Sequence, residues 1–282
     1  SRPVGDAMAT TIWGTSSSWT LTALPLFVWM GEILFRTKLS ENLFKGLSPW
    51  MQKLPGGLIH VNVVGCALFA AISGSSAATV ATVGKMSIPE LRKRNYPEKI
   101  LLGSLAGSGT LGLLIPPSII LIIYGVAVQE SIAKLFIAGI IPGIMIALIF
   151  MSYVIIWSLI NKKSMPKIIE EYSFFEKIKR SKQLLPVIIL ILAVIGSIYT
   201  GIATATEAAS LGVVGALILS YFQKSLTLKT FKSSLLGATK TSCMIAFILA
   251  GSTFLSLAMG FTGLPRNLAL WIQNMELSPY VL

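Results

Sequence analysis

Charged residues are scarce in this chain, and so are the residues that build catalytic and metal sites. Only 12% of the 282 residues are charged, histidine occurs once and cysteine twice. Cys66 and Cys243 lie inside apolar runs, where a thiol behaves as a small hydrophobe and not as part of a disulfide or metal site. Because His60 is the single histidine, the chain cannot contain a zinc motif of the His-Glu-x-x-His kind. A serine nucleophile would have only this one histidine as its base. We therefore expect no enzyme, no catalytic residue and no organic cofactor.

Hydrophobic residues dominate instead. They make up 54% of the chain, and the mean hydropathy is +0.78. Several runs reach the ~20 residues that a helix needs to cross a hydrocarbon core of ~30 Å. We predict an all-α polytopic membrane protein whose membrane segments are residues 19–36, 57–72, 76–88, 97–127, 135–160, 184–200, 204–222 and 235–260. The formal charge of +12 does not indicate nucleic acid, because the cations lie in short connectors without an aromatic-basic stripe.

The positions of the cations predict how the chain crosses the membrane. If residues 57–88 form a hairpin that enters and leaves on one side, twenty of the 23 lysines and arginines fall on one face. Only Arg2, Lys134 and Arg266 remain on the other face. This asymmetry is the positive-inside bias, which assigns the larger set to the cytoplasm. A full crossing at 57–88 would remove the asymmetry, so we favour a re-entrant hairpin over one long tilted span.

Two connectors carry apolar residues among charges. Residues 163–182 place Ile168, Ile169, Tyr172, Phe175 and Ile178 at helical spacing, and residues 43–54 combine Trp50 and Met51 with lysines. Both patterns predict amphipathic helices that lie on the cytoplasmic surface of the membrane.

A weak internal repeat relates residues 22–35 to residues 242–255 at an offset of 220, with Phe27 on Phe247 and Gly31 on Gly251. Two identities in an apolar background also arise by chance. However, the predicted membrane topology gives the two copies opposite orientations, which is the architecture of many secondary transporters. The offset places Leu282 where a second hairpin would begin, so we expect the natural protein to continue with one. The start SRPVGD has no initiator methionine or signal segment, as in a fragment.

These observations divide the chain into four parts. Residues 1–56 form an outer segment, a scaffold span and a surface helix. Residues 57–160 form the first half of a transport domain, with the hairpin, the segment 97–127 and the span 135–160. Residues 161–183 are an amphipathic connector, and residues 184–282 are scaffold spans of the second repeat.

Two of the membrane segments contain residues that interrupt a helix. The hairpin turns at Ser73 to Ser76, and segment 97–127 contains Gly107, Gly109, Gly112, Pro116 and Pro117. Irregular backbone at membrane depth survives only inside protein or beside a wet cavity. Its free carbonyls and hydroxyls suit a hard cation, and half-helix N-termini suit an anion. Since Glu207 is the one candidate carboxylate at this depth, sodium fits these neutral oxygens better than a divalent ion. Close helix packing by small residues is the alternative.

Four strings resemble one known family: SGSSAATVATVGKMSIPEL, LAGSGTLGLLIPPSIILIIYG, SIAKLFIAGIIPG and GIATATEAA, at residues 73–91, 105–125, 131–143 and 201–209. The chain is similar to the large, M-type membrane subunit of the tripartite ATP-independent periplasmic, or TRAP, transporters. The resemblance implies an elevator-type, sodium-coupled importer of small organic acids in the bacterial inner membrane. It also implies two partners, a periplasmic binding protein and a small Q-type membrane subunit that is separate or fused. GKMSIPEL at 84–91 resembles the sialic-acid branch, with C4-dicarboxylates as the alternative.

The resemblance also implies where ligands bind. Matching motif to motif, the hairpin tip and the broken helix would form a sodium site from Ser73, Gly74, Ser75, Ser76, Gly109, Gly112, Pro116 and Pro117. An adjacent substrate cavity would use Ser75, Ser76, Thr110 and Ser118. A second sodium site would belong to the second hairpin. An ion channel with a re-entrant loop is a less favoured alternative, because repeats of opposite orientation favour alternating access.

One motif departs from the family pattern. The family usually has Thr-Pro-Thr-Glu where this chain has Thr204, Ala205, Thr206 and Glu207. Thr204 and Glu207 keep the spacing of a capping box, in which both side chains bond to backbone amides at a helix start. We therefore favour a structural role for Glu207 over proton or cation coupling, which an acid at the end of a span would also allow.

Overall fold

The computed structural model of the protein describes residues 4–37, 39–166, 172–182 and 184–275. The regular elements in these ranges are all helices. Three are long and apolar enough to cross a membrane: α8 (Ile132–Ile160), α11 (Ala205–Phe222) and α12 (Leu228–Thr262); two bent helix pairs would bring the number to five. The predicted class, an all-α polytopic membrane protein, is confirmed.

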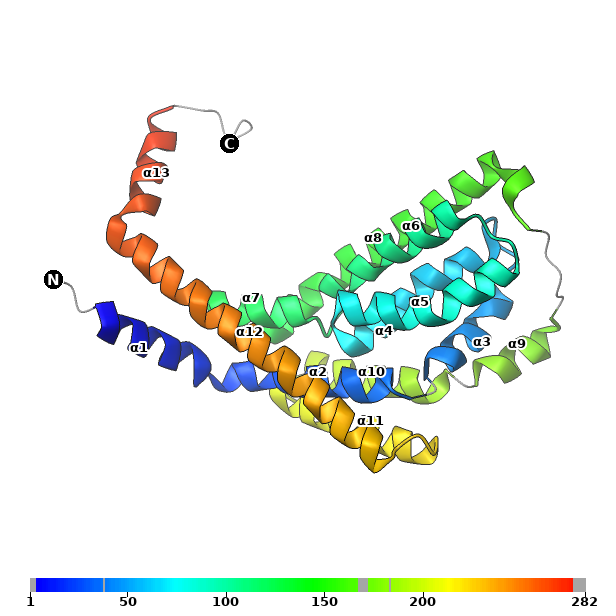
Figure 1. Ribbon diagram of the computed structural model, residues 1–282, viewed down its shortest axis with the longest axis horizontal. Coiled ribbons are helices and arrows are strands. Elements are labelled where there is room, and N and C mark those ends of the chain that lie inside the picture. The colour runs from blue at the N-terminus through cyan, green and yellow to red at the C-terminus, as the bar shows by residue number, and fades with distance from the viewer. Residues whose placement is uncertain (1–3, 38, 167–171, 183, 276–282) are drawn as a thin grey trace.

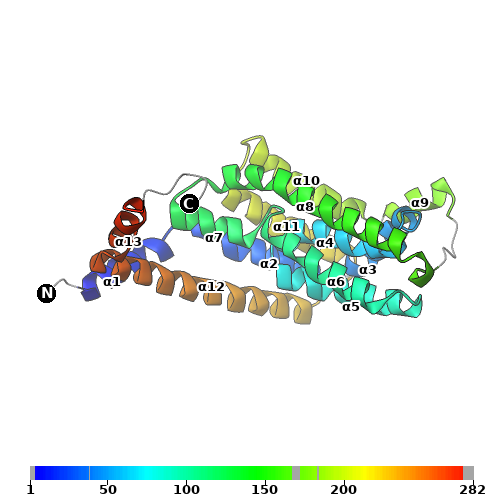
Figure 2. The same ribbon diagram turned by 90° about the horizontal axis from the view of Figure 1, so that it is seen from above.

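One part of the molecule is built around α2 (Ala23–Phe35), and we call it the scaffold. α2 packs against both α11 and α12, and α10 (Leu185–Tyr199) packs against α11. Most side chains of α2 are buried, as expected for a helix in which Glu32 is the one charged residue. α2 and α12 run in opposite directions (Figures 1 and 2), which agrees with the predicted inverted repeat.

The two glycines that the repeat aligns have different surroundings. Gly31 lies against the hairpin tip: a Cβ atom added to it would be 2.8 Å from the Cα of Ser73. A Cβ atom added to Gly251 would meet no described atom within 4 Å. The internal repeat therefore stays a prediction.

The first turns of α12 are charged, and the rest of the helix is not. Lys229, Lys232 and Lys240 precede Thr241, and no charged residue follows before Thr262. The helix begins seven residues before the predicted start at 235. Thr227 explains the difference, because its hydroxyl accepts a hydrogen bond from Thr230 N at 3.1 Å and caps the helix.

The second part of the molecule is a bundle of α4 (His60–Ser73), α5 (Ser76–Lys93), α6 (Glu98–Gly109), α7 (Ile119–Val128) and α8. α4 and α5 form the predicted hairpin, and α6 packs against both. At 14 residues, α4 is about 21 Å long, which is too short for a ~30 Å hydrocarbon core. The lengths therefore agree with a re-entrant hairpin.

The predicted break in segment 97–127 is present. α6 ends at Gly109, a 3-10 turn η3 (Thr110–Leu113) follows, and α7 begins only at Ile119. α8 accommodates this irregular stretch through two glycines. Cβ atoms added to Gly139 and Gly143 would lie 2.6 Å from Leu114 O and 3.0 Å from Ile115 Cγ1. Because glycines have no side chain, the broken segment can approach the backbone of α8 closely at these two positions.

Surface helices connect the two parts. In α3 (Leu39–Met51) and α9 (Phe174–Ser181), Trp50 Nε1 donates to Ser181 Oγ at 2.8 Å, and the Trp50 ring meets Phe174 edge-on. α9 is shorter than the predicted helix over 163–182, of which Ile168 and Ile169 lie outside the described residues.

Two terminal helices were not predicted from the sequence. α1 (Val4–Ser16) precedes a short 3-10 turn, η1 (Trp19–Thr22), and α13 (Leu264–Gln273) follows α12 after a turn at Gly263. Both contact α12.

Candidate transport site

The hairpin tip lies directly against the broken helix. Gly74 has φ 58°, the left-handed conformation that ends α4, and its carbonyl oxygen accepts a hydrogen bond from Ile119 N at 3.2 Å. A Cβ atom added to Gly74 would be 2.6 Å from Pro117 O. Only glycine combines this backbone conformation with so close an approach. The structure thus brings together the tip and the C-terminal side of the break.

The N-terminal side of the break contacts the start of α5. A Cβ atom added to Gly112 would lie 3.0 Å from Ser76 N, and one added to Gly109 would overlap the Val80 side chain. Pro116 and Pro117, joined by a cis peptide bond, are both buried. All eight residues of the predicted sodium site therefore belong to two segments that touch.

The hydroxyls at the tip differ in their partners. Ser73 Oγ lies 3.0 Å from Thr79 Oγ1, and Ser75 Oγ accepts from Ala78 N at 3.4 Å as the cap of α5. Ser76 Oγ is buried and bonds to none of the described residues. It is therefore the tip hydroxyl that is free to bind a ligand.

One buried hydroxyl next to the break was not predicted from the sequence, that of Ser108. This residue is fully buried on α6, next to Gly109, and its Oγ also lacks a partner within the described part of the chain. The signal was available in the spacing, because Leu101, Ser104, Leu105 and Ser108 recur on one helical face and all are buried. A serine on the buried face of a glycine-rich half-helix is a candidate oxygen ligand.

The predicted substrate residues lie in two different settings. Thr110 is exposed and its hydroxyl donates to Gly107 O at 2.7 Å, whereas Ser118 is buried and its hydroxyl donates to Leu113 O at 2.7 Å. Neither residue lines the cavity at the tip. The other two, Ser75 and Ser76, do line it.

This tip cavity, about 430 Å³ in volume, separates the bundle from α12. Gly74, Ser75 and Ser76 form one side with residues of α7, and Thr241, Met244, Ile245, Ile248 and Leu249 of α12 form the other. α5 and α7 both begin at its edge, so two helix N-termini face it. Such ends carry partial positive charge, which favours an anionic group. The described residues contain no cluster of three or more carboxylate, histidine or cysteine side chains that could hold a metal.

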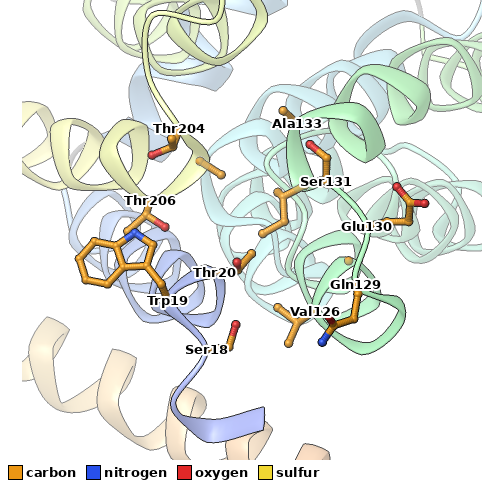
Figure 3. A pocket seen from close by; sticks show the side chains of 13 residues that line it. Ser18, Trp19, Thr20, Val126, Gln129, Glu130, Ser131, Ala133, Thr204 and Thr206 are labelled. Atoms are coloured by element: carbon orange, nitrogen blue, oxygen red, sulfur yellow. The ribbon is translucent and has the colours of Figure 1, made fainter. Parts of the chain in front are cut away.

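A second pocket, of about 450 Å³, lies where α11 begins. The α7–α8 loop, with Gln129 and Ser131, borders it on the bundle side, and Trp19, Thr204 and Thr206 border it on the scaffold side (Figure 3). It shares no lining residue with the tip cavity. The two parts of the molecule are thus separated by a gap here as well.

The motif that departs from the family pattern forms the predicted capping box. Thr204 N donates to Glu207 Oε2 at 2.8 Å, and Glu207 N donates to Thr204 Oγ1 at 3.3 Å. Both bonds lie at the first turn of α11.

The substitution Glu207→Gln separates the two roles considered for this residue. Glutamine also completes a capping box, so uptake by the intact protein should stay near the wild-type rate, and Glu207→Ala should lower the free energy of unfolding by about 1 kcal/mol. Uptake and thermal unfolding measure the two effects. Loss of uptake in Glu207→Gln with unchanged unfolding would assign the carboxylate to coupling instead.

A helical hairpin and an interrupted helix that meet beside a cavity define a class, the polytopic membrane transport proteins with discontinuous helices. The profile of the family described as "Tripartite ATP-independent periplasmic transporter, DctM component" matches residues 2–282. The chain belongs to this family of TRAP transporter large permeases.

Several relatives share about a third of its residues. Identity is 32% over 277 residues with the C4-dicarboxylate TRAP transporter large permease protein DctM of Pseudomonas aeruginosa, covering 98% of this chain and 64% of that protein. Identity is also 32% over 272 residues with the sialic acid TRAP transporter large permease protein SiaM of Vibrio cholerae, covering 95% and 62%. Identity with the isethionate TRAP transporter permease protein DctMQ of Oleidesulfovibrio alaskensis is 32% over 268 residues, covering 94% of this chain and 41% of that protein. The chain thus spans less than two thirds of each of these relatives.

Proposed function

We propose that the protein carries out sodium-coupled import of a small organic acid, with sodium bound between the hairpin tip and the broken helix. The contact of Gly74 with Pro117 and Ile119, together with a buried Ser76 hydroxyl that bonds to none of the described residues, is the observation that carries the proposal. Neutral hydroxyl and carbonyl oxygens in a protein interior suit a hard monovalent cation. A bound ion would hold the tip against the break and so shape the tip cavity beside it.

The substrate is proposed to be a carboxylate that occupies the tip cavity. The N-termini of α5 and α7 supply partial positive charge for the acid group, and the isoleucines and Met244 of the wall contact the rest of the molecule. The relatives' names include a C4-dicarboxylate, sialic acid and isethionate, all of which are acids. We favour sialic acid because of the GKMSIPEL string, with C4-dicarboxylates as the alternative.

Movement of the bundle against the scaffold is the proposed transport step. The interface between the two parts is mostly apolar: α2 packs against α4 and α7, and Phe27 meets Phe136 edge-on at 6.1 Å. One polar bond crosses it among the described residues, from Tyr199 Oη to Phe136 O at 3.3 Å. Because the interface has few polar bonds, the bundle can form a similar interface at another position along the membrane normal with little loss of free energy. The bundle is the rigid unit, and the scaffold supports it.

The proposed setting is the bacterial inner membrane, with two partners. A periplasmic binding protein would deliver the acid, and a small Q-type membrane subunit, separate or fused, would brace the scaffold. The relative named DctMQ, of which this chain covers 41%, is in keeping with a fused form.

Uptake in proteoliposomes tests the proposal. The intact protein, with its small subunit and its binding protein, should accumulate labelled sialic acid only under an inward sodium gradient and only when the binding protein is present. Malate and succinate serve as the C4-dicarboxylate arm of the assay. Sodium-independent uptake, or currents far above the uptake rate, would contradict a coupled carrier.

A further inference from the structure

A second group of buried polar atoms lies between α4, α5 and α6, away from the tip. Asn62 on α4 is 0% exposed, and its Nδ2 donates to Leu101 O at 3.2 Å and to Ser104 Oγ at 3.0 Å on α6. Its Oδ1 is buried and has no hydrogen-bond partner among the described residues. The same holds for the Oγ of Ser87 on α5, which is also 0% exposed. Two buried oxygens on neighbouring helices thus have unused hydrogen-bonding capacity.

The contact between α5 and α6 places Ser87 at the level of Asn62. These helices run antiparallel, and a Cβ atom added to Gly84 would be 2.8 Å from Leu105 Cδ2. Ser87 follows Gly84 by three residues on α5, and Leu101 precedes Leu105 by four residues on α6. Because the helices are antiparallel, both steps lead in the same direction, away from the tip. The Leu101 carbonyl is the one that Asn62 binds, so Ser87 lies level with this hydrogen bond.

The contact between α4 and α5 gives the same result independently. A Cβ atom added to Gly65 would be 3.6 Å from Val83 Cγ1 across the hairpin. Asn62 on α4 and Ser87 on α5 each lie one helical turn further from the tip than this contact. Both sets of contacts therefore place Asn62 and Ser87 at the same point along the three-helix contact, on the faces of α4 and α5 that meet there.

We propose that this point is a binding site for one ordered water molecule, which donates to Asn62 Oδ1 and exchanges a hydrogen bond with Ser87 Oγ. A buried polar atom left unpaired costs about 1–3 kcal/mol, and buried waters typically satisfy about three such groups. A metal cation fits poorly, since hard cations take about six oxygens while the Leu101 and Ser104 oxygens already accept amide hydrogens. The water links the three helices into one unit, whatever the protein transports.

The substitution Ser87→Ala tests the water site, because the sign of its effect depends on whether water is bound. With water bound, the alanine removes one of its partners, and the unfolding temperature of the intact protein in detergent should fall by about 2–4 °C. In a dry site the alanine removes an unpaired hydroxyl, and the temperature should stay constant or rise. Ser220→Ala is the matched control, since the Ser220 hydroxyl is buried but bonded to Ala216 O at 2.7 Å.

Two further measurements complete the test. A density map of the intact protein that resolves ordered water should show one peak between Asn62 and Ser87. Unfolding is then repeated with choline in place of sodium. An equal decrease in both salts supports water, whereas a decrease seen only in sodium would identify a cation and overturn the proposal. A constant or raised unfolding temperature with no density peak would overturn it too.

Discussion

Replacing Gly74 by valine is expected to abolish sodium-dependent uptake. The left-handed backbone at Gly74 costs a β-branched residue about 1–3 kcal/mol, and the added side chain would collide with the Pro117 carbonyl oxygen, 2.6 Å from the Cβ position. The tip must then move away from the broken helix, which separates the two halves of the proposed sodium site. Each 1.4 kcal/mol corresponds to a factor of ten, so we expect a decrease in uptake of about a hundredfold or more.

The control for this change is a glycine in the same bundle. Gly103 lies on α6, is exposed, and has no described atom within 4 Å of its Cβ position. Gly103→Val should therefore transport at close to the wild-type rate. Initial uptake rates are compared at equal amounts of folded protein, checked by size-exclusion chromatography. Normal uptake by Gly74→Val would show that the tip contact is not needed for transport.

Replacing Ser76 or Ser108 by alanine should weaken sodium binding without closing the substrate cavity. Hydrogen-bonding and ligand contacts to a charged group are worth about 1.5–3 kcal/mol each. Losing one oxygen should therefore raise the sodium concentration for half-maximal uptake by about ten- to a hundredfold. At saturating sodium, the KM for the acid should change little, because neither substitution adds bulk.

Thr110→Val provides the comparison, since Thr110 is exposed and its hydroxyl bonds to the Gly107 carbonyl in the last turn of α6. Its sodium dependence should match that of the wild type. If the alanine variants also keep the wild-type sodium dependence, sodium does not bind at these hydroxyls. A change in the KM for the acid alone would assign Ser76 to the substrate instead.

The features that sequence analysis predicted well are those with strong local signals. Long apolar runs gave α8 and α11 within a few residues and the apolar part of α12, because a membrane helix must satisfy every backbone group internally. Serine, glycine and proline located the hairpin tip and the break, since these residues disfavour helix regardless of their neighbours. The capping box at Thr204 and Glu207 followed from spacing alone.

What sequence analysis missed depends on which way a side chain points after the helices pack. Thr110 and Ser118 lie in or beside the break, where the regular helical phase is lost, so the direction of their hydroxyls could not be predicted. Their role in substrate binding stays a prediction. Ser108 was missed although its helix is regular, because an unpartnered hydroxyl is visible only once α5 and α6 are in contact. The same applies to Asn62 and Ser87, which are 25 positions apart in the chain.

The point on α12 where the charged residues end indicates how deep in the membrane the tip cavity lies. Lys240 ends the charged turns, and the 22 residues from Thr241 to Thr262 are about 33 Å long, close to the ~30 Å of a hydrocarbon core. The cavity contacts α12 only from Thr241 to Leu249, which is the half next to the lysines. The positive-inside rule predicts that this half faces the cytoplasm. In the proposed cycle this arrangement is therefore the inward-facing one, in which the acid is released into the cell, and loading requires the tip to travel toward Thr262.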